Sequence, residues 1–573
     1  MAVPLIEKKS RSYLPESFQI NTWEDLAPFF EELESRSLHS KEELEKWLKD
    51  CSEFESVISE EVCWRQIRMT CDTENPKLTQ SFEFFMTSIQ PMIQPVADRL
   101  NRKLIDCPFT SELDPKKYFT YLRNVRKNIE LFRESNVPIL SALAVAQQEY
   151  GIISGKMTVE VNGEEYTLAQ ASKFLEDPDR TLRESVYHKI FRRREEDRDT
   201  LETLFEELLE KRQALAINTA HADYRSYRFA ELGRFDYSPK DCELFHQAVR
   251  EQVMPLVNEL MEAKRKQLGV DRLRPWDVEA EPIGTQPLRP FQAGQDLIDK
   301  TIGCLQRLDP FFSACISTMQ EMGRLDVESR KGKAPGGYNC PLAETGAPFI
   351  FMNAAGTLDD VTTMVHESGH AVHSFLCHPL ELNGFKEYPT EIAEVASMSM
   401  ELFTMDHWSV FFPDPKELNR AKQQQLERVI LLFPWIATID AFQHWLYLNP
   451  GHTRSEREAA WLEILNTYTS SVIDVSGTET YRSFLWQRQL HLFEVPFYYI
   501  EYGIAQLGAI GLWQQYQQDP KQALIRYQKA LQAGGTRTLP ELFELAGLRF
   551  DLSSNYIGEL MRFVKTELEK IGH

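Results

Sequence analysis

Residues 361–370 read VTTMVHESGH, and within them His366-Glu367-Ser368-Gly369-His370 forms an H-E-x-x-H pattern. Residues four apart lie on one face of an α-helix, so both imidazoles can reach a single metal ion. Glu367 follows the first ligand, where it can act on a metal-bound water without ligating the metal. Asp359 and Asp360 stand where a helix N-cap and first turn favour acids. The stretch therefore predicts a zinc-binding helix.

A third protein ligand is needed, because two histidines leave a zinc site incomplete. Glu394 begins an apolar-periodic run that ends at Phe403 and predicts a second helix. Glu391, one turn earlier on roughly the same face, is the rival ligand, and spacing alone does not separate the two. The bare pentapeptide also occurs by chance in unrelated helices. The acidic second helix favours a zinc hydrolase site over chance occurrence.

The segments HESGHAVH (366–373) and EIAEVASMSME (391–401) together resemble the thimet oligopeptidase and oligoendopeptidase F family of zinc peptidases. The resemblance extends to GKAPGGYN, PFIFMNAAGTLDDVTT and HLFEVPFYYIEYGIAQLGA, and covers most of the chain from about Val159 onward. It is closer to the oligoendopeptidase F branch. It implies that His366, His370 and Glu394 hold one Zn²⁺ per chain, with Glu401 as a later acid.

The same resemblance implies a mainly α-helical, two-lobed fold with a deep substrate channel and a small β-sheet near the metal. His373 lies about 10 Å along the helix axis from His366, given a rise of about 1.5 Å per residue, which is too far for one tetrahedral site. We expect His373 to lie behind the ligands and to pair with Glu401.

Residues 491–502 read HLFEVPFYYIEY and offer a second group of polar side chains. Peptide hydrolysis forms a tetrahedral oxyanion, which a phenol or an imidazole can stabilise as a donor. Taken alone, such an aromatic run is more often core packing. By the resemblance, His491, Tyr499 and Tyr502 match the family's substrate-binding and transition-state-stabilising residues. The spacing is one residue shorter than in the thimet branch, so the choice between Tyr498 and Tyr499 stays open.

Upstream of the metal helix, residues 332–339 form a glycine-containing loop that lets backbone approach a ligand closely. Residues 349–353 predict a short strand, and we expect it to be an edge strand that binds the substrate backbone by strand addition. An ordinary buried strand is the alternative. The residues assigned to substrate binding are Gly336, Gly337, Tyr338, Phe351, Asn353 and Tyr498.

Composition narrows the class of protein. The net charge of −22 over 573 residues disfavours nucleic acids and anionic membranes as partners, because both attract clustered Lys and Arg. Nine cysteines without a C-x-x-C pair indicate reduced thiols. The N-terminus lacks a secretory signal pattern, and the most apolar run, 429–437, is shorter than the about 20 residues of a membrane span. We expect a cytoplasmic protein, monomeric or homodimeric.

Two parts are expected along the chain. Residues 20–150 predict long helices, and alternation around Asn162-Gly163 predicts a β-hairpin over residues 157–168 with a type I′ turn. Residues 268–290 are rich in Pro and Gly and predict loop or short strand. We expect an N-terminal helical region over 1–195 and a helical catalytic region over 196–573.

These observations predict a zinc-dependent endopeptidase that hydrolyses internal bonds of short, unfolded oligopeptides through a metal-activated water. Glu367 is the predicted base, with Tyr499, Tyr502 and His491 stabilising the oxyanion. The alternative is a zinc carboxypeptidase of similar helical fold, in which Arg482 or Arg488 holds the substrate's terminal carboxylate. A peptide-binding scaffold without catalysis is a further alternative, although Glu367 and the three ligands are intact.

Overall fold

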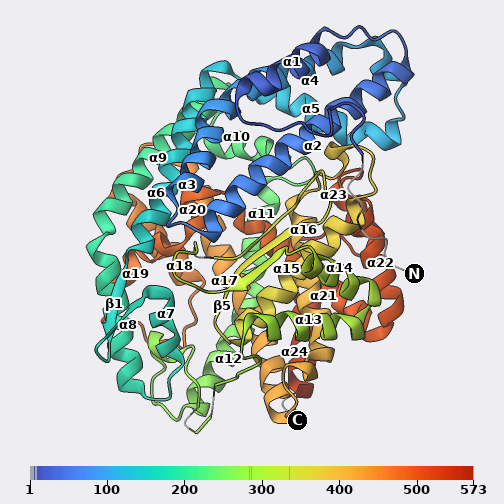
Figure 1. Ribbon diagram of the computed structural model, residues 1–573. Helices are drawn as coiled ribbons and strands as arrows, with labels where there is room; N and C mark the ends of the chain where they lie inside the picture. Colours follow the sequence, from blue (N-terminus) through green and yellow to red (C-terminus); the bar gives the residue numbers. More distant parts are fainter. Residues whose placement is uncertain (1–5, 7–9, 283, 286, 335, 572–573) are drawn as a thin grey trace. The chain divides into compact units, whose positions relative to one another are not determined.

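The computed structural model describes residue 6 and residues 10–571 except 283, 286 and 335. Helices dominate these residues, with one two-stranded and one three-stranded sheet, so the predicted mainly α class is confirmed (Figure 1). The chain divides into two compact units. Unit 1 comprises residues 1–137, 288–421 and 504–550, and unit 2 comprises residues 138–287, 422–503 and 551–573. Neither unit begins or ends at residue 195, and a division there stays a prediction.

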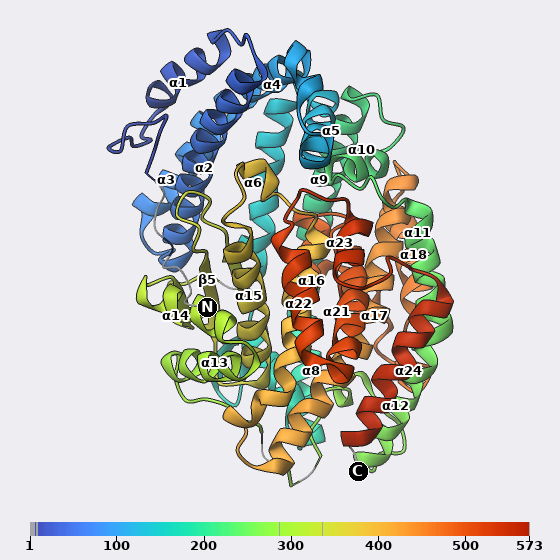
Figure 2. The ribbon, with the colours of Figure 1, turned by 90° about the vertical axis from the view of Figure 1, so that its right-hand side faces the viewer.

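Unit 1 begins with helices that pack around Trp47, Phe54 and Phe85. It also contains the predicted metal helix, α15, against which α13 and α14 pack (Figure 2). Its helices are α1 (Trp23–Ser35), α2 (Lys41–Cys71), α3 (Pro76–Phe84), α4 (Gln90–Asp106), α5 (Pro115–Leu131), α13 (Gly294–Leu308), α14 (Pro310–Glu321), α15 (Leu358–Cys377), α16 (Thr390–Thr404), α22 (Pro520–Gln532) and α23 (Leu539–Leu545).

The sheet of unit 1 precedes the metal helix and has the order β3-β5-β4. Its strands are β3 (Leu325–Glu328), β4 (Tyr338–Cys340) and β5 (Phe349–Ala354). β5 pairs with β3 in parallel and with β4 antiparallel, so the expectation that residues 349–353 form an edge strand is wrong. The reason is that β4, formed by the end of the glycine loop, covers the side that an added substrate strand would need. The edge of the sheet beside β5 belongs to β4.

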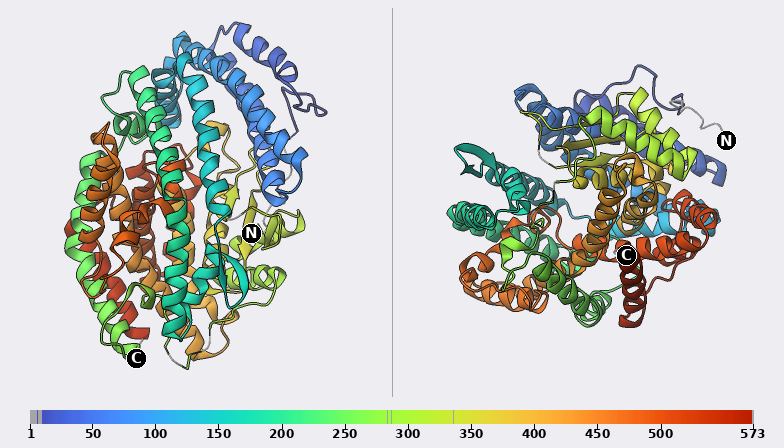
Figure 3. Two further views of the ribbon diagram at one scale, coloured as in Figure 1. Left: turned by 90° about the vertical axis from the view of Figure 1, so that its left-hand side faces the viewer. Right: turned by 90° about the horizontal axis from the view of Figure 1, so that it is seen from below.

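Unit 2 contains the predicted hairpin, with β1 (Thr158–Val161) antiparallel to β2 (Glu164–Thr167) and packed against α8 (Figure 3). Asn162 and Gly163 both have positive φ, 55° and 85°, as a type I′ turn requires. The helices of unit 2 are α7 (Leu168–Ser172), α8 (Arg180–Glu196), α9 (Arg198–Asn218), α10 (Tyr224–Glu231), α11 (Pro239–Ala248), α12 (Met254–Gln267), α18 (Arg454–Thr467), α19 (Glu479–Ser483), α20 (Leu490–Glu494) and α24 (Ser554–Ile571).

Three helices contain residues of both units: α6 (Val137–Gly155), α17 (Pro415–Leu448) and α21 (Tyr499–Gln518). By length and composition, α17 is the one helix in the described part of the chain that could cross a membrane. However, 72% of its most apolar 18-residue window is buried inside the structure. A buried core helix accounts for this hydrophobicity, because core helices of large proteins are apolar on most sides.

Candidate functional site

The metal helix α15 has Asp359 and Asp360 in its first turn, as expected from the sequence, and its N-cap is one residue before Leu358. Thr357 is the N-cap, and its hydroxyl accepts the backbone N–H of Asp360 at 3.3 Å. The carboxylate of Asp360 in turn accepts the backbone N–H of Thr357 at 2.8 Å, which completes a capping box. The cap fixes the start of α15, and with it the face on which His366 and His370 lie one turn apart.

Helix α16 packs directly on α15, and Gly369 permits this close approach (Figure 1). A Cβ atom at Gly369 would lie 2.6 Å from the backbone oxygen of Ala396 and 2.6 Å from the Cα of Ser397. No side chain fits between the two backbones, since Cβ contacts under 3.0 Å are essentially never observed. The glycine between the two histidines therefore sets how near Glu394, on α16, comes to them.

The two histidines and Glu394 converge. Glu394 Oε2 lies 3.4 Å from His366 Nε2 and 3.7 Å from His370 Nε2. One ligand atom from each of the three lies within 4.8 Å of the others. Glu391, which spacing left open, is buried but is not part of this group. The geometry therefore favours Glu394 over Glu391 as the third donor.

Glu401 determines which nitrogen of His366 faces the group. Glu401 Oε1 lies 2.7 Å from His366 Nδ1, and a carboxylate accepts, so Nδ1 carries the proton. In a neutral ring, Nε2 then holds a lone pair, which is the form that binds a metal. Glu401 therefore pairs with His366, and the expectation that it pairs with His373 is wrong. His373 instead stacks on Tyr388, with ring centroids 3.7 Å apart. The donor set fits zinc by chemistry and by tautomer.

Burial and neighbouring charges act on the protons of this group. Burial lowers the pKa of His370 to about 4. Burial also lowers the pKa of His366, but hydrogen bonds to Glu394 and Glu401 outweigh it and raise this pKa above the ordinary value. Burial raises the pKa of Glu367 to about 7. Glu367 Oε2 is buried without a hydrogen-bond partner among the described residues. A carboxylate with such a pKa is suited to take up and release a proton near neutral pH.

The glycine loop and the strands around it are held together by side chains assigned to substrate binding. Asn353 Nδ2 donates to the backbone oxygens of Ala334 at 2.8 Å and Gly336 at 2.9 Å. Tyr338 stacks on Phe351, which is 0% exposed, with centroids 4.8 Å apart. Phe351 and Asn353 thus shape the sheet and the loop. Gly337 lies near the backbone oxygen of Phe351, where an added Cβ would come within 3.4 Å.

In unit 2, three tyrosines gather around His491. The His491 ring centroid lies 4.9 Å from Tyr499, 5.8 Å from Tyr502 and 5.9 Å from Tyr498. Tyr499 is only 9% exposed, whereas Tyr498 and Tyr502 are half-buried. Burial raises the pKa of Tyr499 to about 12, which keeps its hydroxyl protonated. Tyr498 and Tyr502 are thus the more exposed tyrosines of the group.

Three arginines, of which Arg212 and Arg234 are buried, hold the backbone of the segment that carries this group. Arg212, 0% exposed, donates to the backbone oxygens of Leu492 and Phe493. Arg228 Nε donates to Pro496 O at 3.1 Å, and Arg234 donates to Phe497 O. Charged donors make short, strong hydrogen bonds to carbonyl groups. The segment is thus fixed by residues far away in sequence.

Phe497 needs such support because it has a positive φ of 66°. For a residue with a Cβ, this left-handed conformation costs about 1–2 kcal/mol. Its N–H donates to Gln443 Oε1 at 2.5 Å, and its ring is 0% exposed. Arg234 also pairs with Glu501 at 2.9 Å, so Phe497 and the first turn of α21 share one anchor.

Matches to known proteins agree with this geometry. The model of peptidase family M3 matches residues 173–562, and the model of the peptidase M3 N-terminal domain matches residues 15–132. The chain belongs to peptidase family M3. The resemblance stated from the sequence is therefore confirmed, as is the expectation of an enzyme family.

Individual members of this family are distant in sequence. An oligoendopeptidase F homolog of Lactococcus lactis subsp. lactis is 24% identical over 70% of this chain, and the match spans 66% of that protein, less than two thirds of its length. Oligopeptidase PepF of Bacillus subtilis is 23% identical over 70% of this chain and 61% of its own length. A solved structure of PZ peptidase A with an inhibitor is 26% identical, with a TM-score of 0.91, and covers 96% of this chain and 98% of that one.

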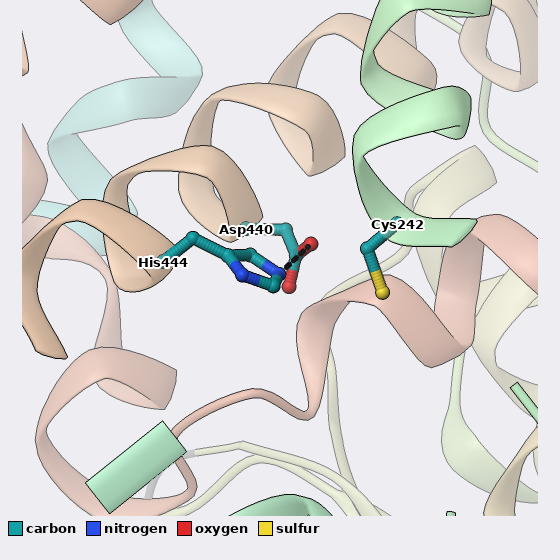
Figure 4. Close-up of side chains that lie close together, drawn as sticks. All are labelled: Cys242, Asp440 and His444. Carbon is teal, nitrogen blue, oxygen red and sulfur yellow. Dashed lines mark ion pairs between the residues drawn. The ribbon is translucent and has the colours of Figure 1, made fainter. Parts of the chain in front are cut away.

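This M3 chain contains a second group of metal-type donors in unit 2: Cys242 on α11, and Asp440 and His444 on α17 (Figure 4). Asp440 Oδ2 accepts from His246 Nε2 at 2.8 Å and lies 3.3 Å from His444 Nε2. Arg225 Nη1 lies 3.2 Å from His444 Nδ1, and a guanidinium only donates. The neutral His444 ring therefore carries its proton on Nε2, facing the carboxylate. This arrangement fits a buried carboxylate held by histidines better than a metal site.

Sequence reasoning did not find the residues that support His491. Gln489 bonds to His491 at 2.6 Å, and Trp435 on α17 bonds to Gln489 at 2.8 Å. Neither residue belongs to a motif, and neither do Arg212 and Arg234. The only local signal for Gln489 is its closeness to His491 in the chain. The other three become neighbours of the segment only when the helices pack.

Proposed function

We propose that this M3-family chain is a zinc-dependent endopeptidase that hydrolyses internal bonds of short, unfolded oligopeptides. The observation that carries the proposal is the convergence of His366, His370 and Glu394, with Glu401 fixing the proton of His366 on Nδ1. Membership of peptidase family M3 supports the same activity. We also propose one zinc per chain, oligopeptide substrates, a cytoplasmic location and a monomeric or homodimeric state.

In this proposal, each residue of the metal site has one task. His366 and His370 present Nε2 atoms and Glu394 a carboxylate oxygen to zinc, which supplies Lewis acidity when bound. Glu367 takes a proton from the attacking water at a carboxylate oxygen and returns it to the nitrogen of the leaving amine. The pKa of about 7 that burial gives Glu367 suits both steps near neutral pH.

The family resemblance assigns the oxyanion to donors in unit 2. His491, Tyr499 and Tyr502 are the assigned residues, with Tyr498 as the alternative to Tyr499. A hydroxyl or an N–H aimed at the oxyanion lowers the barrier by about 3–4 kcal/mol. Among the tyrosines, the half-buried Tyr498 and Tyr502 suit this task better than Tyr499, which is nearly covered.

The carboxypeptidase alternative gains no support from its candidate arginines. Arg482 Nη2 donates to Asn466 Oδ1 at 2.6 Å, and Arg488 lies over the ring of Trp435, 4.6 Å from its centroid. Both side chains thus have partners within unit 2.

The test uses an internally quenched peptide of about 10 residues, blocked at both ends, with zinc measured in each protein. Internal cleavage by the wild type, and its loss in a Glu367→Gln variant that still binds zinc, is the expected result. Trimming of a free C-terminus without cleavage of the blocked peptide would instead establish a carboxypeptidase. A wild-type chain that binds zinc and cleaves neither peptide would favour a scaffold.

A further inference from the structure

A chain of hydrogen bonds in unit 2 runs from Trp435 to His491. Trp435 Nε1 lies 2.8 Å from Gln489 Oε1. An indole N–H only donates, so the atom of Gln489 that faces it is the carbonyl oxygen, which accepts. This contact fixes which end of the amide is oxygen and which is nitrogen. The amide nitrogen of Gln489 consequently points the other way, toward His491.

The second contact determines the tautomer of His491. Gln489 Nε2 lies 2.6 Å from His491 Nδ1. An amide nitrogen only donates, so Nδ1 must accept and carries no proton. A neutral imidazole has a single ring proton, which then belongs to Nε2.

The third contact joins the protonated Nε2 of His491 to the hydroxyl of Tyr502. His491 Nε2 lies 3.5 Å from Tyr502 Oη, and with the proton on Nε2 the ring is the donor. The phenol oxygen accepts, and its own O–H is directed to a different acceptor. The distance is long, as catalytic contacts often are before substrate binds. Tyr499, beside the same Trp435 and Gln489 side chains, keeps its proton because its pKa is about 12.

We propose that Gln489, oriented by Trp435, is a positioning residue that holds His491 as the Nε2–H tautomer, so that Tyr502 acts as a hydrogen-bond donor to the developing oxyanion. The role of Tyr502 in this proposal rests on the proposed peptidase function. The tautomer of His491 does not, because it can be measured in the protein without substrate. The proposal assigns a task to Gln489 and Trp435, which lie outside the sequence motifs quoted above. Removing the amide donor of Gln489 changes which nitrogen of His491 carries the proton, but it leaves His491 and Tyr502 in place.

The first experiment reads the tautomer directly. The full, zinc-loaded chain is labelled with ¹⁵N-histidine, and His491 is assigned by the signals lost in His491→Gln. NMR correlation of ring nitrogens with ring protons distinguishes a protonated from an unprotonated nitrogen. The expected result is an unprotonated Nδ1 and a protonated Nε2 in the wild type. A Gln489→Glu variant, whose carboxylate accepts, should place a proton on Nδ1.

The second experiment measures cleavage of the blocked peptide. Gln489→Glu is expected to lower kcat about 10–100-fold with little change in KM, somewhat less than deleting an oxyanion donor. Trp435→Phe keeps the ring but removes the N–H, so both amide orientations of Gln489 become possible and the loss is smaller. Gln267→Glu, the same change at an exposed position of α12, is the control and should match the wild type.

The outcomes separate the two proposals. A wild-type His491 with its proton on Nδ1, or a tautomer unchanged in Gln489→Glu, overturns the positioning role while the peptidase proposal stands. The expected tautomer in a chain whose Glu367→Gln variant cleaves as well as the wild type overturns the proposed mechanism instead. An equal kcat for Gln489→Glu and wild type, despite a changed tautomer, overturns the link to Tyr502.

Discussion

His366 in unit 1 and His491 in unit 2 are the same side chain used in opposite ways. Nδ1 of His366 donates to the carboxylate of Glu401 at 2.7 Å, which leaves a lone pair on Nε2 when the ring is neutral. Nδ1 of His491 accepts from the amide of Gln489 at 2.6 Å, which leaves a proton on Nε2. The partner of Nδ1 thus decides whether the other nitrogen can bind a metal or donate a hydrogen bond.

The two regions also differ in how they are built. The metal group comes from two helices adjacent in sequence, and His366 and Glu401 are 35 residues apart. The His491 segment depends on Arg212 and Arg228, which are 280 and 268 residues from the carbonyls they bind. Local helix geometry therefore creates the first region, whereas distant packing creates the second.

The largest expected effect tests whether distant arginines hold the second region. Arg234→Met removes the donor to Phe497 and leaves the carboxylate of Glu501 buried, where the two paired side chains are 1% and 2% exposed. Breaking a buried ion pair in this way lowers the free energy of unfolding by about 3–5 kcal/mol. Urea denaturation measures the change. Arg454→Met, at a pair with both side chains 42% exposed, is the control and should cost under about 1 kcal/mol; equal losses would contradict the buried anchor.

The next effect concerns Tyr502, the last residue in the series of hydrogen bonds that begins at Trp435. Tyr502→Phe removes the proposed oxyanion donor, so kcat should fall about 10²–10³-fold with zinc content unchanged. Steady-state cleavage of the blocked peptide and metal analysis measure both. Tyr499→Phe, at the covered position, should cost less. A larger loss for Tyr499→Phe than for Tyr502→Phe would transfer the donor role to Tyr499.

A smaller effect is expected on the metal side of the comparison. Glu401→Gln replaces the carboxylate that accepts from His366, so zinc affinity should weaken about 10–100-fold. Competition with a chelator measures this affinity. Glu391→Gln, at a buried acid on the same helix, should leave it unchanged. A weaker affinity in Glu391→Gln than in Glu394→Gln would show that the wrong acid was chosen as ligand.

The smallest effect concerns a third histidine arrangement, in which His246 and His444 flank Asp440. Burial raises the pKa of Asp440, but the two histidines outweigh it and hold this pKa well below its usual range. The carboxylate therefore contributes stability above about pH 4, which is lost as the pH falls further, by at most about 1.4 kcal/mol per pH unit. Denaturation midpoints of wild type and Asp440→Asn between pH 6 and 3 measure it. The stability of Asp440→Asn should fall less than that of the wild type as the pH is lowered. Asp271→Asn, at an exposed position, should lose stability in the same way as the wild type.

The sequence was sufficient for features that depend on residues close together in the chain. Helix spacing predicted that His366 and His370 come together, and the Asn162-Gly163 pair predicted the hairpin. It failed where partners come from elsewhere. Phe349–Asn353 reads as a strand, but nothing in it shows that β4 occupies its outer side. His373 lies on the metal helix, yet contact with Tyr388 decides its environment. Gln489 carries no signal until Trp435 packs beside it.

The left-handed Phe497 has a consequence for the order of synthesis. Arg212 leaves the ribosome 280 residues before its acceptor at Leu492. At about 5–20 residues per second, this interval lasts roughly 14–56 s. During that time Arg212 lacks the two backbone oxygens that it binds in the folded chain, whereas Arg228 already has Glu231 three residues away. The arginines are thus synthesised well before the carbonyl groups that they bind, and the contacts that hold the left-handed Phe497 can form only after residues 492–497 have been made.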